Sequence, residues 1–260
     1  MIVAGVDIGS STSKAVLLGD DAILSYSIIF TGSESVHSAN QVLDQVLQKS
    51  NLSFKDIQYI VATGYGRVIV PFAHEALTEL TCHARGAHWL FPEVRTILDM
   101  GGQDCKAIRC DRAGRLQNFV MNDKCAAGTG RFLELMARVL GLSLDDLGEI
   151  SLGAASAIKI NSTCAVFAKS EVTSLIREGK ERKEVIAGLH SAIAGRVYTL
   201  LRGVGIEPEL AVSGGIGKNK GVVQEIEKRL GMKVLLPPEP QIVGALGAAL
   251  FARDKLGNPT

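Results

Sequence analysis

The chain has 260 residues and a nearly balanced charge, with 28 Lys+Arg against 27 Asp+Glu and a formal net charge of +1. Apolar residues make up 47% and charged residues 21%, which excludes a disordered chain and supplies a sizeable core. The balanced charge excludes nucleic acid and the membrane surface as main partners, and no apolar run approaches the about 18 residues of a membrane-spanning helix.

The start of the chain, MIVAGVD, lacks the basic and long apolar regions of a secretion signal. We therefore expect a cytoplasmic protein. In that compartment the five cysteines are expected to be thiols or metal ligands rather than disulfides.

Apolar patterning in the first part of the chain predicts strands joined by a glycine turn, with helices after them. The first strand ends in Asp7-Ile8-Gly9, and a Ser/Thr run leads into the second. We expect strands at residues 2–8, 14–18, 22–30 and 57–63, and helices at residues 35–48 and 73–90.

The opening pattern of an apolar residue, Asp, an apolar residue, Gly and a small residue returns 92 residues later. Asp7 and Lys14 in the first copy correspond to Asp99 and Lys106 in the second. This repeat predicts two related halves, although short Asp-x-Gly turns also recur by chance. The second part is expected to hold strands at residues 96–100, 105–108, 116–121, 211–213 and 234–236, and helices at residues 130–140, 165–177, 183–202, 219–230 and 241–253.

Three glycine turns follow predicted strands and are candidates for binding a nucleotide. Glycine accepts positive φ and lets backbone N–H groups converge on an anion. Asp7 and Asp99 are candidates to orient water around Mg²⁺, which takes few protein ligands. The residues expected to bind the nucleotide are Gly9, Ser10, Ser11, Thr12, Ser13 and Lys14 in the first turn, Gly101, Gly102 and Gln103 in the second, and Gly214 and Gly215 in the third.

Neither the P-loop pattern nor the dinucleotide-binding pattern occurs in the chain. Two hairpin phosphate turns, with a third glycine turn for the nucleoside, instead resemble the actin, heat-shock chaperone and sugar-kinase superfamily over the whole length. The resemblance implies an α/β fold of duplicated actin-like ATPase (ribonuclease H-like) halves around a nucleotide cleft. Residues 1–94 plus 241–260 would form the first half and residues 95–240 the second.

The end of the second turn carries the candidate catalytic residues. Asp104 and Gln103 are placed to position or deprotonate an attacking water or acceptor, because phosphoryl transfer depends mostly on positioning and electrostatics. The alternative for Asp104 is a turn carboxylate that caps nearby N–H groups.

Two cysteines share a context, since Cys125 and Cys164 each follow polar residues and precede a predicted helix. The partial positive charge of a helix N-terminus favours a thiolate and the anionic cluster that a thiolate can bind. A four-iron cluster needs four thiolates, so these two would serve it only on the two-fold axis of a homodimer. The alternative is a pair of buried, inert thiols. Cys82, Cys105 and Cys110 have no assigned role.

Four runs of sequence carry a more specific resemblance: NDKCAAGTGRF at residues 122–132, STCAVFAKSE at 162–171, GGQD at 101–104 and ATGYGR at 62–67. Together they resemble the activators of 2-hydroxyacyl-CoA dehydratases. They also resemble the ATP-dependent reductases that serve benzoyl-CoA reductase and double-cubane cluster proteins.

The resemblance implies a homodimer with one [4Fe–4S] cluster between subunits, held by Cys125 and Cys164 of each. It further implies ATP and Mg²⁺ in each subunit and ATP hydrolysis coupled to transfer of one low-potential electron. Reduced ferredoxin or flavodoxin would load the protein, and an iron–sulfur dehydratase or reductase would receive the electron.

Two other functions are compatible with the superfamily. A small-molecule, sugar-type kinase would use Asp104 as the base for a substrate hydroxyl, and its cysteines would be inert. A nucleotide-responsive assembly module would need filament contacts, for which the short chain has no extended polar insertion. Both alternatives predict a colourless protein, whereas the electron-transfer protein is expected to be brown.

Overall fold

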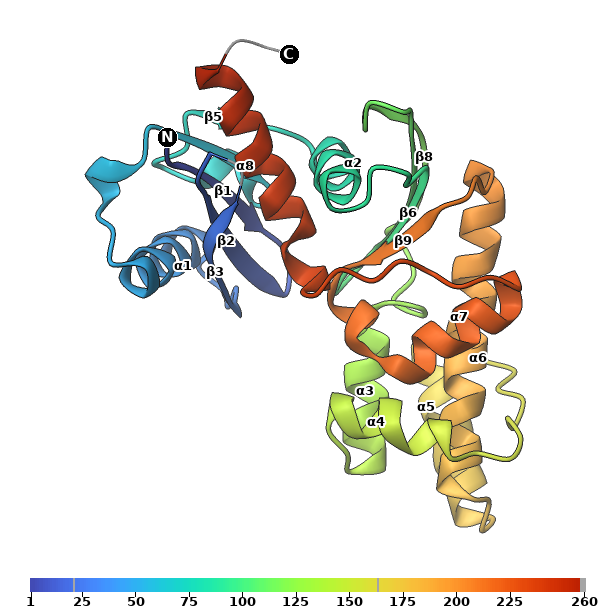
Figure 1. The fold of residues 1–260 in the computed structure, drawn as a ribbon. Helices are drawn as coiled ribbons and strands as arrows, with labels where there is room; N and C mark the ends of the chain where they lie inside the picture. The colour runs from blue at the N-terminus through green and yellow to red at the C-terminus, as the bar shows by residue number, and fades with distance from the viewer. Residues whose placement is uncertain (21, 163, 258–260) are drawn as a thin grey trace.

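The computed structural model describes residues 1–20, 22–162 and 164–257. Groups of strands are followed by helices along the chain, and the protein is of mixed α/β type (Figure 1). The strands are β1 (Val3–Ile8), β2 (Thr12–Leu18), β3 (Ile23–Phe30), β4 (Tyr59–Thr63), β5 (Glu75–Ala76), β6 (Thr96–Met100), β7 (Cys105–Cys110), β8 (Leu116–Asn122) and β9 (Leu210–Ser213). The helices are α1 (Ser35–Ser50), α2 (Glu79–Leu90), α3 (Gly130–Leu140), α4 (Leu144–Leu152), α5 (Ala165–Arg177), α6 (Arg182–Val204), α7 (Lys220–Leu230) and α8 (Val243–Leu256).

The strands form two separate sheets with the same internal plan. The first has the order β3-β2-β1-β4-β5 and the second the order β8-β7-β6-β9. In the first, β1 pairs antiparallel with β2 and places Asp7 opposite Lys14. In the second, β6 pairs antiparallel with β7 and places Asp99 opposite Lys106. A parallel strand flanks each hairpin, β4 beside β1 and β9 beside β6, so the structure confirms the predicted repeat.

Each sheet is covered by helices that turn an apolar stripe toward it. On α1, Val42, Leu43 and Val46 are buried against one face of the first sheet, which matches the helical spacing of these residues. Helix α8 covers the other face of that sheet. The second sheet shares a core with α3, α5, α6 and α7.

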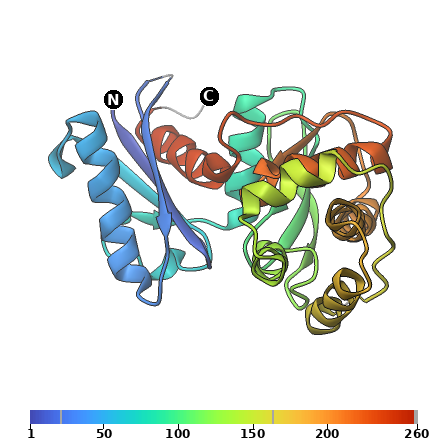
Figure 2. The ribbon, with the colours of Figure 1, turned by 90° about the horizontal axis from the view of Figure 1, so that it is seen from below.

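Helices α2 and α8 lie between the two sheets and cross in close contact (Figure 2). A Cβ on Gly247 would come 1.8 Å from the carbonyl oxygen of Cys82, and one on Gly86 would come 2.2 Å from that of Val243. Only glycine lets two helices approach so closely. The C-terminal helix therefore packs against α2 through small residues.

The structure differs from the prediction in three places. Residues 73–90 are not one helix, because Glu75 and Ala76 pair with β4 and Thr78 then caps α2. Helix α4 was not predicted, although Ser143 and Asp146 form a capping box at its start. Residues 234–236 contribute only one isolated bridge, from Leu235 to Ala211, in place of a strand. Within the described ranges, no helix is long and apolar enough to cross a membrane.

Candidate functional site

The first glycine turn joins β1 to β2 and is closed by a hydrogen bond from the Gly9 N–H to the Thr12 carbonyl, 3.1 Å long. Beside it, the Lys14 ammonium lies 3.1 Å from the Asp7 carboxylate. Thr31, which follows β3, supports the turn by donating to the Gly9 carbonyl at 2.7 Å. The turn thus presents a largely buried acid–lysine pair to the space beside it.

The second turn repeats this geometry between β6 and β7, where the Gly101 N–H donates to the Asp104 carbonyl at 2.9 Å. Its lysine has more partners than Lys14 has. The Lys106 ammonium lies 2.8 Å from Asp104, 2.9 Å from Glu79 and 3.6 Å from Asp99. Burial alone would lower the pKa of Lys106, but these three carboxylates raise it, so the ammonium stays charged at neutral pH.

The Asp99 carboxylate is fixed by groups from three elements. It accepts a hydrogen bond of 3.0 Å from the Ser213 hydroxyl, and the His83 Nδ1 atom lies 3.5 Å away. Burial by itself would raise the pKa of Asp99, but His83 and Lys106 together lower it below its ordinary value. Asp99 is therefore an anion at neutral pH, and its orientation is set.

The third turn follows β9 and continues through a short 3-10 helix into α7. Gly214 has φ of +83°, and a Cβ there would lie 2.3 Å from the Met100 carbonyl oxygen. Only glycine fits at this position. The third turn is thus pressed directly against the second.

The three turns surround one cavity of about 690 Å³, a volume that suits a nucleotide. A Cβ on Gly102 would come 2.1 Å from the Ser11 hydroxyl, so the first two turns also meet across it. The predicted residues that line the cavity are Asp7, Gly9, Ser10, Ser11, Thr12, Lys14, Asp99, Gly101, Gly102, Gln103, Asp104, Gly214 and Gly215.

Ser13 is the predicted nucleotide-binding residue that the structure places elsewhere. Its side chain is buried, and its hydroxyl lies 2.9 Å from that of Thr31. Because strand side chains alternate between faces, Ser13 points away from the side of β2 that carries Thr12 and Lys14. It supports the first turn from behind.

Sequence reasoning missed several cavity residues, above all Glu79 and His83 on α2. They are four residues apart and therefore share one face of the helix. The four-residue spacing was a signal available in the sequence. An acidic residue and a histidine on one face of a helix are, however, equally typical of an exposed surface. Lys218, Asn219 and Gln241 were missed in the same way.

The five cysteines separate into two classes. Cys82, Cys105 and Cys110 are buried, and burial raises the pKa of Cys82 to about 12 and of Cys110 to about 11. Burial raises the pKa of Cys105 as well. Cys125 and Cys164 are exposed, so the alternative of buried thiols at these two positions is wrong.

Both exposed cysteines lie beside a helix start, as predicted. Cys164 is the N-cap of α5, and Cys125 precedes α3 by five residues. Thr163, within the second cysteine run, lies outside the described residues. In the described part of one chain, no group of three or more His, Cys, Asp or Glu side chains is arranged to hold a metal ion.

A direct contact joins the second turn to the cysteine run before α3. The first two backbone N–H groups of α3, from Gly130 and Arg131, donate to the Gly101 and Gly102 carbonyls at 3.0 and 2.9 Å. The Cys105 thiol also donates to the Gly128 carbonyl at 3.0 Å. The start of α3 is therefore fixed to the glycines expected to hold phosphate.

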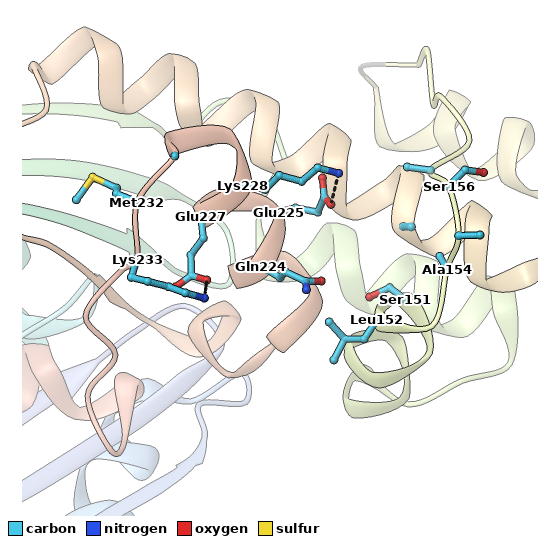
Figure 3. Close-up of a pocket in the computed structure, with 14 residues that line it drawn as sticks. Ser151, Leu152, Ala154, Ser156, Gln224, Glu225, Glu227, Lys228, Met232 and Lys233 are labelled. Carbon is cyan, nitrogen blue, oxygen red and sulfur yellow. Dashed lines mark hydrogen bonds and ion pairs between the residues drawn. The ribbon is translucent and has the colours of Figure 1, made fainter.

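A second cavity, of about 590 Å³, lies between the end of α4 and α7 (Figure 3). Its charged side chains pair with one another, Glu225 with Lys228 at 3.6 Å and Glu227 with Lys233 at 2.6 Å. Among the described residues, those that line it include no residue predicted to bind nucleotide or metal. The cavity between the glycine turns is therefore the candidate site.

Comparisons with known proteins give the family and the fold of the chain. The sequence profile of the BadF/BadG/BcrA/BcrD ATPase family matches residues 4–252. The activator of lactoyl-CoA dehydratase from Anaerotignum propionicum is 46% identical over 255 residues, which cover 98% of each chain. A solved structure of the activator of 2-hydroxyisocaproyl-CoA dehydratase from Clostridium difficile with bound ADPNP has a TM-score of 0.94 at 41% identity. That match covers 98% of this chain and 95% of the other.

A more distant structure bears on the fold alone. The ROK family glucokinase from Streptomyces griseus, in complex with glucose and AMPPNP, has a TM-score of 0.62 at 13% identity and covers 98% of this chain and 100% of its own. The predicted two-part fold, like that of actin-like ATPases and sugar kinases, is confirmed.

Proposed function

Because the chain belongs to the BadF/BadG/BcrA/BcrD ATPase family, we propose that it is an ATP-hydrolysing iron–sulfur protein that injects one low-potential electron into a partner iron–sulfur enzyme. The relatives named as dehydratase activators support a recipient of the dehydratase or reductase class. ATP hydrolysis would give the transfer its direction.

The observation that carries this proposal is the contact between the second glycine turn and α3. The Gly101 and Gly102 carbonyls accept hydrogen bonds from the first amides of α3, and the run with Cys125 leads directly into that helix. A change of phosphate state at the turn would therefore displace the helix start beside Cys125.

The cysteines fit a shared [4Fe–4S] cluster, which supplies a one-electron redox centre when bound. Cys125 and Cys164 are exposed thiols, and Cys164 is the N-cap of α5, where free N–H groups favour a thiolate. One chain offers two such thiols and a cubane needs four, so two copies related by a two-fold axis would complete the set. Val166 and Phe167, each 67% exposed beside Cys164, are apolar side chains that such a dimer would cover.

The nucleotide would lie between the glycine turns with its phosphates on the first two and its adenosine beside Gly214. Asp7 and Asp99 line the same cavity, and carboxylate oxygens suit Mg²⁺. Each carboxylate already has a lysine neighbour, which favours contact with the metal through water over direct ligation. Gln103 and Asp104 would position the attacking water.

We place the division between the halves at residues 1–94 plus 241–260 and 95–240, of which 258–260 lie outside the described range. Closure of these halves on ATP would move α3 and α5 together. A reduced ferredoxin or flavodoxin is the proposed electron donor. Such a protein would work in the cytoplasm of an anaerobic cell, because low-potential iron–sulfur chemistry is sensitive to oxygen.

Iron and acid-labile sulfide, measured per chain after anoxic purification, test the proposal. The wild-type protein is expected to be a brown dimer with about two irons per chain, one [4Fe–4S] per dimer. Cys125→Ser and Cys164→Ser should each lose the iron and the colour. Cys110→Ala is the matched control, because this thiol is buried and should leave the iron content unchanged.

Wild-type protein that is folded, prepared without oxygen and free of iron would exclude the electron-transfer function. ATP turnover that then depends on an added sugar or other hydroxyl compound would establish the kinase in its place. Turnover without any such acceptor agrees with the proposed ATPase.

A further inference from the structure

Arg196 on α6 contacts both cysteine-bearing loops, although it is distant from them in the sequence. Its Nη2 atom donates a hydrogen bond of 3.2 Å to the carbonyl of Ser162, two residues before Cys164. A Cβ on Gly128, three residues after Cys125, would lie 3.6 Å from the Arg196 Cδ atom. The Arg196 side chain thus lies close to both loops.

The guanidinium is held in place by packing as well as by hydrogen bonding. Its carbon lies 5.6 Å from the centroid of the buried Phe132 ring in α3, a cation–π distance. The Ser162 loop is fixed independently, because the Ser162 N–H donates to the Glu171 carboxylate at 2.8 Å. Arg196 is therefore a positioned charge rather than a mobile surface side chain.

Part of the charge of Arg196 is not neutralised within the described chain. The Arg196 Nη1 atom is buried and has no hydrogen-bond partner among the residues described here. Burial lowers the pKa of Arg196, and the neighbouring Cys125 acts in the opposite direction. An uncompensated cation this close to a thiol expected to bind an anionic cluster would act on that cluster through its electric field, without direct contact.

We propose that Arg196 is a positioning residue that sets the reduction potential of the cluster by placing a fixed positive charge close to the Cys125 and Cys164 loops. This inference rests on the proposed cluster. Reduction moves one electron from the reduced ferredoxin or flavodoxin, which is oxidised, to the cluster, which gains one negative charge. No bond is formed or broken. A nearby cation stabilises the more negative state and raises the potential.

Other cations near the loops are less suited to this role. Lys124 and Lys169 are exposed, and water and salt screen exposed charges over short distances. Arg196 is half-buried, so its field is screened less. Arg202, an exposed arginine on the same helix, serves as a matched control because it carries the same charge farther along α6.

The test is a redox titration, followed by electron paramagnetic resonance, of the wild-type dimer and of the Arg196→Gln, Arg196→Lys and Arg202→Gln variants. Arg196→Gln should keep its iron, and its equilibrium constant for reduction should fall about tenfold, which is 59 mV for one electron. Arg196→Lys keeps the charge and should stay within about threefold of the wild type. Arg202→Gln should not change the potential.

An unchanged potential in Arg196→Gln with full iron content overturns the inference. Loss of iron in a folded Arg196→Gln protein also overturns it, because the arginine would then act in assembly. If Arg196→Gln does not fold, the Arg196→Lys variant is used instead. A change of about tenfold in its equilibrium constant for reduction contradicts the inference, because the positive charge is kept in that variant. Failure of the proposed function is recognised separately, since the wild-type protein would then lack iron before any variant is compared.

Discussion

The first and second glycine turns are copies of one hairpin, but their surroundings differ. In the first, Lys14 pairs with Asp7 alone among the described residues, and Thr31 of the same sheet supports the turn. In the second, Lys106 is held by three carboxylates, one of them from α2, and the turn carbonyls hold α3. The comparison teaches that a duplicated hairpin acquires a second task through the elements that pack behind it. In the proposed nucleotide site both turns would hold phosphate, and only the second would also pass its presence on to α3.

Removing the lysine from each turn should show the largest difference. Lys106→Met would leave three carboxylates without their buried cation, so the free energy of unfolding should fall by about 3–5 kcal/mol. Lys14→Met leaves one carboxylate without its partner and should cost about 1–3 kcal/mol. Urea denaturation of both variants measures the difference. An equal loss in the two variants would show that the extra carboxylates have no net effect.

Lowering the pH should destabilise the half that carries the second turn before it destabilises the other half. His190 on α6 is fully buried beside the Ser151 hydroxyl, 3.0 Å away, and burial lowers its pKa to about 4. An unfolded chain binds this proton below a pH of about 6.5, whereas the folded protein resists it until the pH approaches 4. The free energy of unfolding should therefore fall by up to about 3 kcal/mol as the pH drops through this window.

Hydrogen exchange across that pH range locates the effect. Amides of α6 and α7 should lose protection before those of the first sheet do. In His190→Leu this part of the pH dependence should disappear. If it persists, the proton is taken up by another group.

The contact between the second turn and α3 can be strained by adding one methyl group. In Gly130→Ala the new Cβ would lie 3.2 Å from the Gly102 Cα atom and 3.3 Å from the Gly101 carbonyl oxygen. Crowding of about 1 kcal/mol should weaken nucleotide binding about fivefold. Titration with a fluorescent ATP analogue measures it.

Gly203→Ala on α6 is the control for that methyl group, because its Cβ would meet Val120 at an ordinary 3.4 Å. Helix propensity alone would make both variants slightly more stable. Unchanged affinity in Gly130→Ala would show that α3 and the second turn move independently.

Two serines in and beside the first turn should affect different properties. Ser11 should contribute mainly to nucleotide binding, and Ser13 mainly to stability. The Ser11 hydroxyl is buried and has no partner among the described residues, so Ser11→Ala should change the free energy of unfolding by less than about 0.5 kcal/mol. It should weaken nucleotide binding about tenfold, because the hydroxyl is expected to donate to phosphate. Ser13→Ala loses the bond to Thr31 and should cost about 1 kcal/mol with little effect on binding. Urea denaturation and titration with the fluorescent ATP analogue measure the two effects. Weaker nucleotide binding in Ser13→Ala with unchanged binding in Ser11→Ala would place Ser13 at the phosphate.

The hairpins and their repeat were predictable because they depend on local signals. Asp7 and Asp99 each stand one residue before the end of a buried strand, and a lysine follows at the same distance in both copies. The turn residues that line the cavity followed from this pattern and from the third glycine turn. Ser13 was assigned to the nucleotide because its neighbours suit phosphate, although strand alternation turns its side chain to the other face.

The remainder of the site could not be read locally because it depends on packing between distant segments. The contact of His83 with the site is created only by the tertiary structure, in which β6 and β9 place Asp99 and Ser213 beside α2. Arg196 is one of many helical arginines until folding places it against the loop at Ser162. The exposure of the cysteines likewise depends on the tertiary fold, since a sequence gives their spacing but not their depth.

The burial of the cysteines also determines which of the thiols are open to oxidation by dioxygen or peroxide. The thiols of Cys82, Cys105 and Cys110 are buried and protonated, and such thiols resist peroxide and dioxygen. Cys125 and Cys164 are accessible, and if they bind the proposed cluster, they would be oxidised first once its iron is lost. Damage would then be confined to two surface positions while the buried thiols stay intact. A protein that has lost the proposed cluster in this way would be inactive rather than denatured, and a thiol reductant that reverses the early steps of oxidation would prepare it for iron and sulfide again.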